Sequence, residues 1–220
     1  MCFSATASFT ASAVLTATGI GTLYHVKETR TLPLASIPLF FGLQQGLEGL
    51  VWISQPGTLP YYFGMYGFLF CAYSLWPTLV PWSIAIYERN VRRNLPLLSI
   101  ATIGTFVGGY FFYELLKGGV SADLSRQSVC YSFWPPLWYG IGLCYIFVVV
   151  LSGLMAKEWF LKIFGIGLAV FFGVARLLVD ESYPSVWCFF GALLSMVIIA
   201  GLHSARGLKP LSKRASPTSD

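Results

Sequence analysis

Charged residues are scarce in this 220-residue sequence, because only 10% are Asp, Glu, Lys or Arg. A soluble globular domain carries about 25%, so the composition argues against one. Instead, 56% of the residues are hydrophobic and the mean hydropathy is +0.69, which is typical of a chain embedded in a lipid bilayer. A net charge of +5 in such a chain indicates membrane topology, and no nucleic-acid partner is expected.

Histidine is also rare. The two histidines, His25 and His203, lie in no H-x-x-x-H or H-E-x-x-H pattern, which argues against a histidine–zinc hydrolase. The last apolar run has no interior lysine, which argues against a retinal protein that binds its chromophore as a Schiff base. The sequence therefore assigns no metal site, no catalytic residue and no cofactor.

Long apolar runs, in contrast, are frequent, and many have the roughly 20 residues that cross a hydrocarbon core about 30 Å thick. Short polar or turn-forming clusters separate them and leave no room for a soluble domain. We predict an all-α membrane protein with about seven transmembrane helices in a single domain, residues 1–205, and a basic, disordered tail, residues 206–220. The predicted spans are Ala5–Tyr24, Leu32–Ile53, Tyr61–Tyr87, Leu95–Leu116, Pro136–Met155, Trp159–Leu178 and Ser185–Leu202.

Lysine and arginine are distributed unequally between the two ends of these spans. Positive residues gather on the cytoplasmic side of membrane proteins, so the richer side predicts an outer amino terminus and a cytoplasmic carboxyl terminus in the cell (inner) membrane. No basic segment precedes the first span, which we therefore expect to be retained rather than cleaved as a signal peptide. The richer side holds Lys27, Arg30, Arg89, Arg92, Arg93, Lys157, Lys162, Arg206, Lys209, Lys213 and Arg214, and the other holds Lys117 and Arg126.

Small residues and prolines predict how the spans pack. Gly42-x-x-x-Gly46 and Gly104-x-x-x-Gly108 are typical of close helix contacts, and the first span has a small-residue face that includes Ser12 and Thr16. Two prolines, Pro77 and Pro81, lie four residues apart in the third span, where they are expected to bend the helix and free backbone carbonyl groups.

Three stretches distributed along the chain share a resemblance. They are Met1-Cys2-Phe3-Ser4-Ala5-Thr6-Ala7-Ser8-Phe9, Phe41-Gly42-Leu43-Gln44-Gln45 with Glu48-Gly49-Leu50-Val51-Trp52, and Ser185-Val186-Trp187-Cys188-Phe189-Phe190. Together they resemble an uncharacterised family of bacterial multi-pass membrane proteins. The resemblance implies a helical membrane fold and no particular activity, ligand or catalytic residue.

Five charged residues lie inside the predicted spans or at their outer ends: Glu48, Glu114, Arg176, Asp180 and Glu181. A charged side chain within a span costs about 2.5–3.5 kcal/mol on insertion scales, so each needs a reason. In the predicted topology all five lie in the outer half of the membrane. We hypothesise that they line one outward-facing pocket.

Helical spacing refines this site, because residues three or four apart share one helix face. In the functional interpretation, Glu48 faces a network centred on Arg176 that holds a proton, a cation or a polar head group. In the structural interpretation, Glu48 is hydrogen-bonded in a polar knot and Asp180 neutralises Arg176. The predicted ligand-binding or proton-coupling residues are Gln44, Gln45, Glu48, Trp52, Glu114, Arg176 and Asp180.

Five cysteines divide into two groups. Cys71 and Cys144 lie within spans and are expected to act as small packing residues. Cys2, Cys130 and Cys188 lie on the outer side, where an oxidising environment permits one disulfide among three pairings. The pair Cys130–Cys188 is the candidate that we carry forward.

Three functions fit this sequence. The first is a protein that binds or transports a small solute, ion or proton in the outward-facing polar pocket. The second is a non-catalytic scaffold or sensor subunit that contacts another membrane protein through its small-residue faces. The third is an intramembrane acid–base enzyme acting on a lipid or isoprenoid substrate. The expected partners are thus the lipid bilayer together with a small solute, a lipid or a membrane protein.

Overall fold

The computed structural model of the chain describes residues 4–124, 129–178 and 183–204. Most of these residues are helical. The helices are α1 (Ala5–His25), α2 (Leu32–Ile53), α3 (Leu59–Leu69), α4 (Trp76–Tyr87), α5 (Val91–Leu116), α6 (Trp138–Met155), α7 (Trp159–Leu178) and α8 (Tyr183–Ser204), with a short 3-10 helix, η1, at Thr29–Thr31. The predicted tail lies outside the described residues. The same is true of Cys2, Arg126, Asp180 and Glu181.

Five helical segments in the described residues are long and apolar enough to cross a membrane: Leu59–Tyr87, Asn94–Leu116, Trp138–Met155, Trp159–Leu177 and Tyr183–Ser204. The prediction of a helical chain with several membrane-length segments is thereby confirmed. Helices α1 and α2 are not among the five, because the threonines and serines of α1 and the polar side chains of α2 lower their hydropathy. Seven spans therefore remain a prediction.

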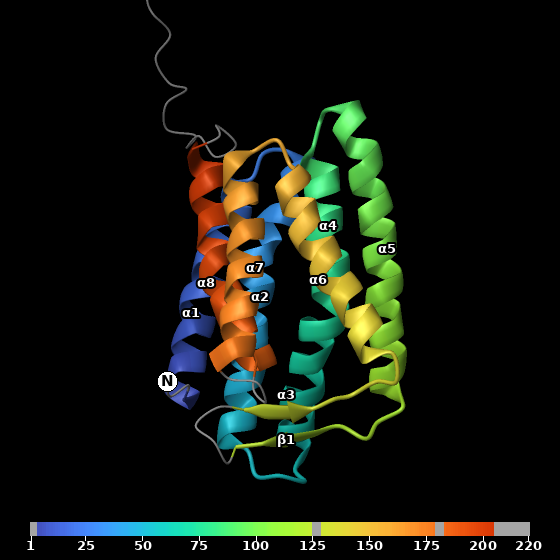
Figure 1. Cartoon of the computed structure of the whole chain (residues 1–220). Helices are drawn as coiled ribbons and strands as arrows, with labels where there is room; N and C mark the ends of the chain where they lie inside the picture. The colour runs from blue at the N-terminus through green and yellow to red at the C-terminus, as the bar shows by residue number, and fades with distance from the viewer. Residues whose placement is uncertain (1–3, 125–128, 179–182, 205–220) are drawn as a thin grey trace, which may run out of the picture.

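The helices lie side by side, roughly aligned with one common axis (Figure 1). Consecutive helices pack against one another, and α8 closes the bundle by packing against α2. At the end of the bundle where α1 begins, a two-stranded antiparallel hairpin joins α5 to α6 through β1 (Ser121–Asp123) and β2 (Cys130–Ser132). We call this the hairpin end, and the other the opposite end. The hairpin is a correction to the all-α prediction. The sequence did not predict it, because strands of three residues each are too short to show a sequence pattern.

The hairpin is attached to the bundle by two tyrosines. The Tyr61 hydroxyl on α3 donates to the Ala122 carbonyl at 2.6 Å and accepts from the Ala122 N–H at 3.2 Å. On β2, the Tyr131 ring stacks on Phe68 with their centroids 4.6 Å apart. These contacts hold β1 and β2 across the end of the bundle.

Glycines bring several helices into backbone contact, as predicted. A Cβ atom added to Gly42 on α2 would lie 2.8 Å from the Thr16 backbone nitrogen on α1. A Cβ atom added to Gly104 on α5 would lie 2.0 Å from the Pro77 carbonyl oxygen, and one on Gly108 would lie 2.5 Å from the Ser74 oxygen. Only glycine permits these approaches, so α5 packs directly on the proline-containing part of the third helical segment.

A wide π-helical turn, η2 (Phe70–Leu75), joins α3 to α4. The Trp76 N–H donates to the Cys71 carbonyl five residues earlier, and the next residue, Pro77, has no N–H to continue this pattern. The Ala72 carbonyl is therefore left without a helical donor, and the Tyr145 hydroxyl on α6 donates to it at 2.9 Å. The predicted effect of the proline, a freed carbonyl, thus becomes a contact between α6 and η2.

At the opposite end, a buried acid joins two loops. One carboxylate oxygen of Glu88 accepts from the Asn90 N–H at 3.0 Å, and the other accepts from the Lys157 N–H at 3.2 Å. The Asn94 amide donates to the Ala85 and Glu88 carbonyls in the same corner. Glu88 thereby fixes the α4–α5 turn against the α6–α7 turn.

Candidate functional site

A group of polar side chains is buried where α2 faces α4 and α8. Gln44, Gln45 and Glu48 share one face of α2 because they are spaced by one turn, and all three are at most 2% exposed. The Glu48 carboxylate accepts a short hydrogen bond from the Ser185 hydroxyl of α8. The Gln44 carbonyl accepts from the indole N–H of Trp76 on α4 at 2.7 Å. We call Gln44, Gln45, Glu48, Trp76 and Ser185 the Glu48 cluster.

Several buried polar atoms in and around this cluster have no hydrogen-bond partner of normal geometry among the described residues. They include the Gln44 amide nitrogen, both amide atoms of Gln45, the indole nitrogen of Trp52 and the Tyr131 hydroxyl. The Gln45 amide lies beside the Glu48 carboxylate. Each unsatisfied buried group costs about 1–3 kcal/mol. Such a concentration in one place is unusual, since buried polar groups are normally satisfied.

The Tyr131 hydroxyl belongs to the same environment. Burial raises the pKa of Tyr131 well above its usual value, and the nearby Glu48 carboxylate adds to this effect. Tyr131 therefore places a hydroxyl of the hairpin within electrostatic range of Glu48, and this hydroxyl remains in the neutral form at ordinary pH.

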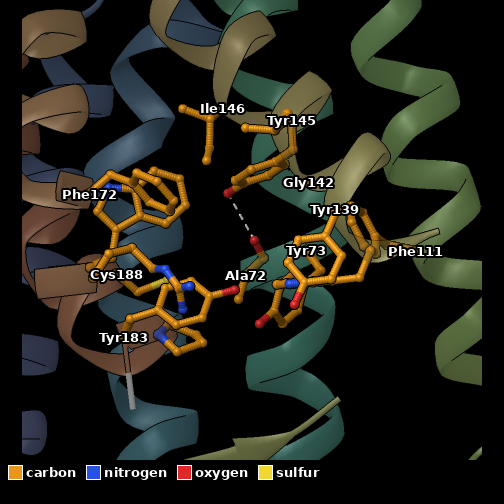
Figure 2. Close-up of a pocket in the computed structure, with 15 residues that line it drawn as sticks. Ala72, Tyr73, Phe111, Tyr139, Gly142, Tyr145, Ile146, Phe172, Tyr183 and Cys188 are labelled. Carbon is orange, nitrogen blue, oxygen red and sulfur yellow. Dashed lines mark hydrogen bonds between the residues drawn. The ribbon is translucent and has the colours of Figure 1, made fainter. Parts of the chain in front are cut away.

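Beside the Glu48 cluster lies a cavity of about 220 Å³. Aromatic rings form most of its wall, and we call it the aromatic cavity. Figure 2 shows the rings of Tyr73 and Phe172 on either side of it, and the Tyr145 hydroxyl directed at the Ala72 carbonyl. Its lining comes from η2, α5, α6, α7 and α8: Ala72, Tyr73, Phe111, Trp138, Tyr139, Gly142, Leu143, Tyr145, Ile146, Phe172, Arg176, Tyr183, Pro184, Trp187 and Cys188.

Polar groups are few in the cavity wall. Arg176 places its guanidinium carbon 4.8 Å from the centroid of the Tyr183 ring, a cation–π distance. Tyr183 also interacts with the Tyr73 hydroxyl by a side-chain hydrogen bond. The Cys188 thiol lines the cavity and lies beside the Gln44 side chain, so it separates the cavity from the Glu48 cluster.

Comparison with known proteins assigns the chain to a protein family. A model of a protein family, described as a family of unknown function (DUF6629), matches residues 1–213. The chain belongs to this family. The match agrees with the prediction of an uncharacterised family, and its description gives no activity. No curated protein and no solved structure matches the chain.

In this DUF6629 protein, two of the stretches behind the resemblance lie against each other. Gln44, Gln45 and Glu48 come from the α2 stretch, and Ser185 and Cys188 come from the stretch that begins α8. The contact between them could not be derived from the sequence, because the order of helices around a bundle is not encoded in hydropathy.

The predicted site residues fall into three places. Arg176 lines the aromatic cavity, whereas Glu48 is not among the lining residues, so the predicted shared pocket corresponds to two adjacent features. Glu114 pairs with Lys117 at 2.7 Å on α5 and belongs to neither feature. Trp52 continues the polar stripe of α2 with its unsatisfied indole nitrogen.

The predicted Cys130–Cys188 disulfide is not formed in the structure, where both residues are free thiols. Side chains alternate between the two faces of a strand. Tyr131 faces the bundle and is buried, so its neighbour Cys130 is directed to the other face of β2, while Cys188 is buried on α8. The described ranges also contain no group of three or more His, Cys, Asp or Glu residues that could hold a metal ion.

Apart from Arg176, sequence reasoning missed most of the residues that line the cavity, and it missed Ser185 and Tyr131 near Glu48. Ser185 gave no signal beyond its place in a resemblance stretch, and Tyr131 lies in a hairpin that was not predicted. The tryptophans Trp138 and Trp187 were not among the predicted site residues, yet both line the cavity. Pro77 was the available signal, since the bend it predicted marks the π-helical turn in the cavity wall.

Proposed function

We propose that this chain is a seven-span protein of the cell membrane that binds a small molecule in the aromatic cavity. Five membrane-length apolar helices support the membrane location. Helices α1 and α2 are 21 and 22 residues long, close to the length of about 20 that a span requires, and they pack beside the other helices. Their length supports two further spans.

The distribution of charge supports an orientation with the hairpin end outside. Lys27, Arg30, Arg89, Arg92 and Lys157 all belong to the turns and helix ends at the opposite end of the bundle. Positive residues gather at the cytoplasmic ends of spans. In this orientation the aromatic cavity lies in the outer half of the membrane.

The observation that carries the binding proposal is the cavity itself. Protein interiors are close-packed, with few voids larger than a water molecule. At about 220 Å³, this cavity exceeds the apolar cavity of about 150 Å³ that binds benzene in an engineered protein. Its walls come from five separate elements and contain few polar groups, as ligand pockets do. The Glu48 cluster lies behind its inner wall.

Two glycines of α6 provide a matched test. Gly142 lines the cavity, and a Cβ atom added to it would meet no atom within 4 Å. Gly140 has equally open surroundings on the same helix, but it does not line the cavity. Both Gly142→Leu and Gly140→Leu favour the helix by replacing glycine. Only Gly142→Leu places its new side chain in the cavity.

Native mass spectrometry of the gently solubilised protein gives the readout. We expect a stoichiometric bound small molecule in the wild-type protein and in Gly140→Leu, and its loss in Gly142→Leu. A small molecule retained equally by both variants would contradict binding in the cavity. A wild-type protein that carries a stoichiometric protein partner and no small molecule would favour the scaffold alternative instead.

A further inference from the structure

The aromatic cavity lies where two helices separate. At the opposite end, α6 and α7 touch through glycine: a Cβ atom added to Gly153 would lie 2.8 Å from the Leu161 carbonyl and 3.0 Å from the Gly165 Cα atom. Toward the hairpin end, Cβ atoms added to Gly142 or Gly173 would meet nothing within 4 Å. Figure 1 shows α6 leaning away from α7 in this direction. The two helices thus form a V that widens at the height of the cavity.

The cavity wall includes residues on the exposed flank of α6. Two of its lining residues on α6, Tyr139 and Leu143, are 82% and 68% exposed. The end of the bundle is crossed by β1 and β2 (Figure 1). In a membrane-spanning bundle, the flank of α6 faces lipid, so a molecule dissolved in the bilayer has a direct path into the V.

Among the described residues of the wall, Arg176 is the one with a positive charge. Its planar guanidinium lies over the Tyr183 ring, with the guanidinium carbon 4.8 Å from the ring centroid. An arginine carries five N–H donors around the edge of that plane, so an existing partner leaves donors for a ligand. A guanidinium in a largely apolar wall suits a carboxylate or phosphate group, and the surrounding rings suit an apolar body.

The cavity size limits how much of a ligand it can hold. A volume of about 220 Å³ is between one and two times the volume of about 150 Å³ that accepts benzene. A head group and the adjoining segment of a ligand fit within it. A longer apolar tail would extend through the V into the bilayer, along the exposed side chains of Tyr139 and Leu143.

We propose that the ligand of the aromatic cavity is a membrane-dissolved amphiphilic anion, which enters between α6 and α7 and places its carboxylate or phosphate head at Arg176. This inference rests on the proposed function, since it names the ligand class of the same cavity. It makes the head charge, the apolar tail and Arg176 jointly necessary for tight binding.

The test uses quenching of tryptophan fluorescence, because Trp138 and Trp187 line the cavity. The protein in lipid nanodiscs is titrated with stearic acid that carries a doxyl quencher near its head, and with the methyl ester of the same acid. We expect the acid to reach half-saturation at a concentration at least ten-fold lower than the ester. A doxyl-labelled alkyl phosphate is the second anionic probe, and a preference between the two anions identifies the head group.

Variants assign the preference to the arginine. We expect Arg176→Gln to remove the difference between acid and ester, and Arg176→Lys to retain part of it because the charge remains. Arg92→Gln is the control, since Arg92 is an exposed arginine at the opposite end. Acetate and inorganic phosphate, which lack a tail, should not compete at millimolar concentration.

Several results would overturn the inference. Equal binding of acid and ester by the wild-type protein would contradict a role for the anionic head group. Effective competition by acetate or phosphate would contradict the need for an apolar tail. The wild-type comparison needs no variant, so it decides even if Arg176→Gln fails to fold. The proposed function is tested separately: if Gly142→Leu still displaces a bound molecule while the acid shows no preference, the cavity binds a ligand of another class.

Discussion

Glu48 and Glu88 are both buried glutamates, 2% and 6% exposed, at different levels of the same bundle. Among the described residues, the ion pairs Arg89–Glu28 and Lys117–Glu114 include neither of them. At Glu88, each carboxylate oxygen accepts a backbone N–H from a different turn. At Glu48, the Ser185 hydroxyl donates to the carboxylate and the Gln45 side chain lies beside it, but among the described residues the Gln45 amide atoms and the Tyr131 hydroxyl have no hydrogen bond of normal geometry.

The difference separates a structural acid from a candidate functional one. A buried group whose hydrogen bonds are complete contributes to stability, whereas unsatisfied groups around a carboxylate cost stability unless something else uses them. Burial alone does not distinguish these cases. The partners of each atom do, and the same isosteric change at both acids can test the distinction.

The largest effect is expected for Glu88→Gln. The amide nitrogen cannot accept a hydrogen bond, so the N–H of either Asn90 or Lys157 loses its acceptor. We expect the free energy of unfolding to fall by about 1.5–3 kcal/mol, the range for hydrogen bonds to charged groups. Unfolding in a denaturing-detergent titration, followed by tryptophan fluorescence, measures the change. Glu28→Gln, in an exposed ion pair, is the control and should have little effect.

A second comparison uses the two tyrosines that attach the hairpin. Tyr61→Phe removes both hydrogen bonds to Ala122 and should destabilise the protein by about 1–1.5 kcal/mol. Tyr131→Phe removes a buried hydroxyl without a partner of normal geometry and should be neutral or slightly stabilising. The same unfolding titration applies to both. Equal destabilisation by the two variants would show that the Tyr131 hydroxyl is satisfied in the folded protein.

Glu48→Gln is expected to change the unfolding free energy by less than about 1 kcal/mol. The carbonyl of the new Gln side chain can still accept from the Ser185 hydroxyl. Its amide N–H can donate to the carbonyl of the neighbouring Gln45 side chain. Any effect should then appear in ligand binding, measured by the quenching titration. A loss of stability equal to that of Glu88→Gln would make Glu48 a structural residue as well.

Alkaline pH provides a further comparison. Burial raises the pKa of Tyr131 above the unfolded value of about 10, so its contribution to stability is complete below pH 10 and is lost as the pH rises further. The stability difference between pH 8 and pH 11 should therefore be smaller in Tyr131→Phe than in the wild-type protein. An identical difference in both would show that Tyr131 does not titrate differently on folding.

Helix positions were predictable because hydropathy and turn residues report them directly. The limits of α2 and α7 coincide with the predicted spans Leu32–Ile53 and Trp159–Leu178. The start of α5 was placed four residues late, because the helix extends past the apolar run to Asn90, whose side chain caps the Arg92 N–H. The hairpin was missed because its pairing is specified by contacts with the bundle rather than by a local pattern.

The candidate site was predictable only along single helices. The spacing of Gln44, Gln45 and Glu48 places them on one face of α2, which the structure shows. Their partner Ser185 lies 137 residues away, and no periodicity connects the two. The aromatic cavity depends on the separation of α6 from α7 and on the π-helical turn, both of which arise from packing in three dimensions.

The π-helical turn at Phe70–Leu75 has a consequence for how this segment tolerates changes in length. A π-turn holds one residue more than the α-helical turn it replaces, and one residue corresponds to a rotation of about 100° about the helix axis. Because the wide turn fits its extra residue into the same full rotation, deleting a single residue there would restore a regular α-helix and leave α3 and α4 in nearly the same rotational phase. Tyr61 would then stay beside the hairpin and Trp76 beside Gln44, whereas a deletion in the α-helical part of the segment would turn α3 relative to α4 by about 100°.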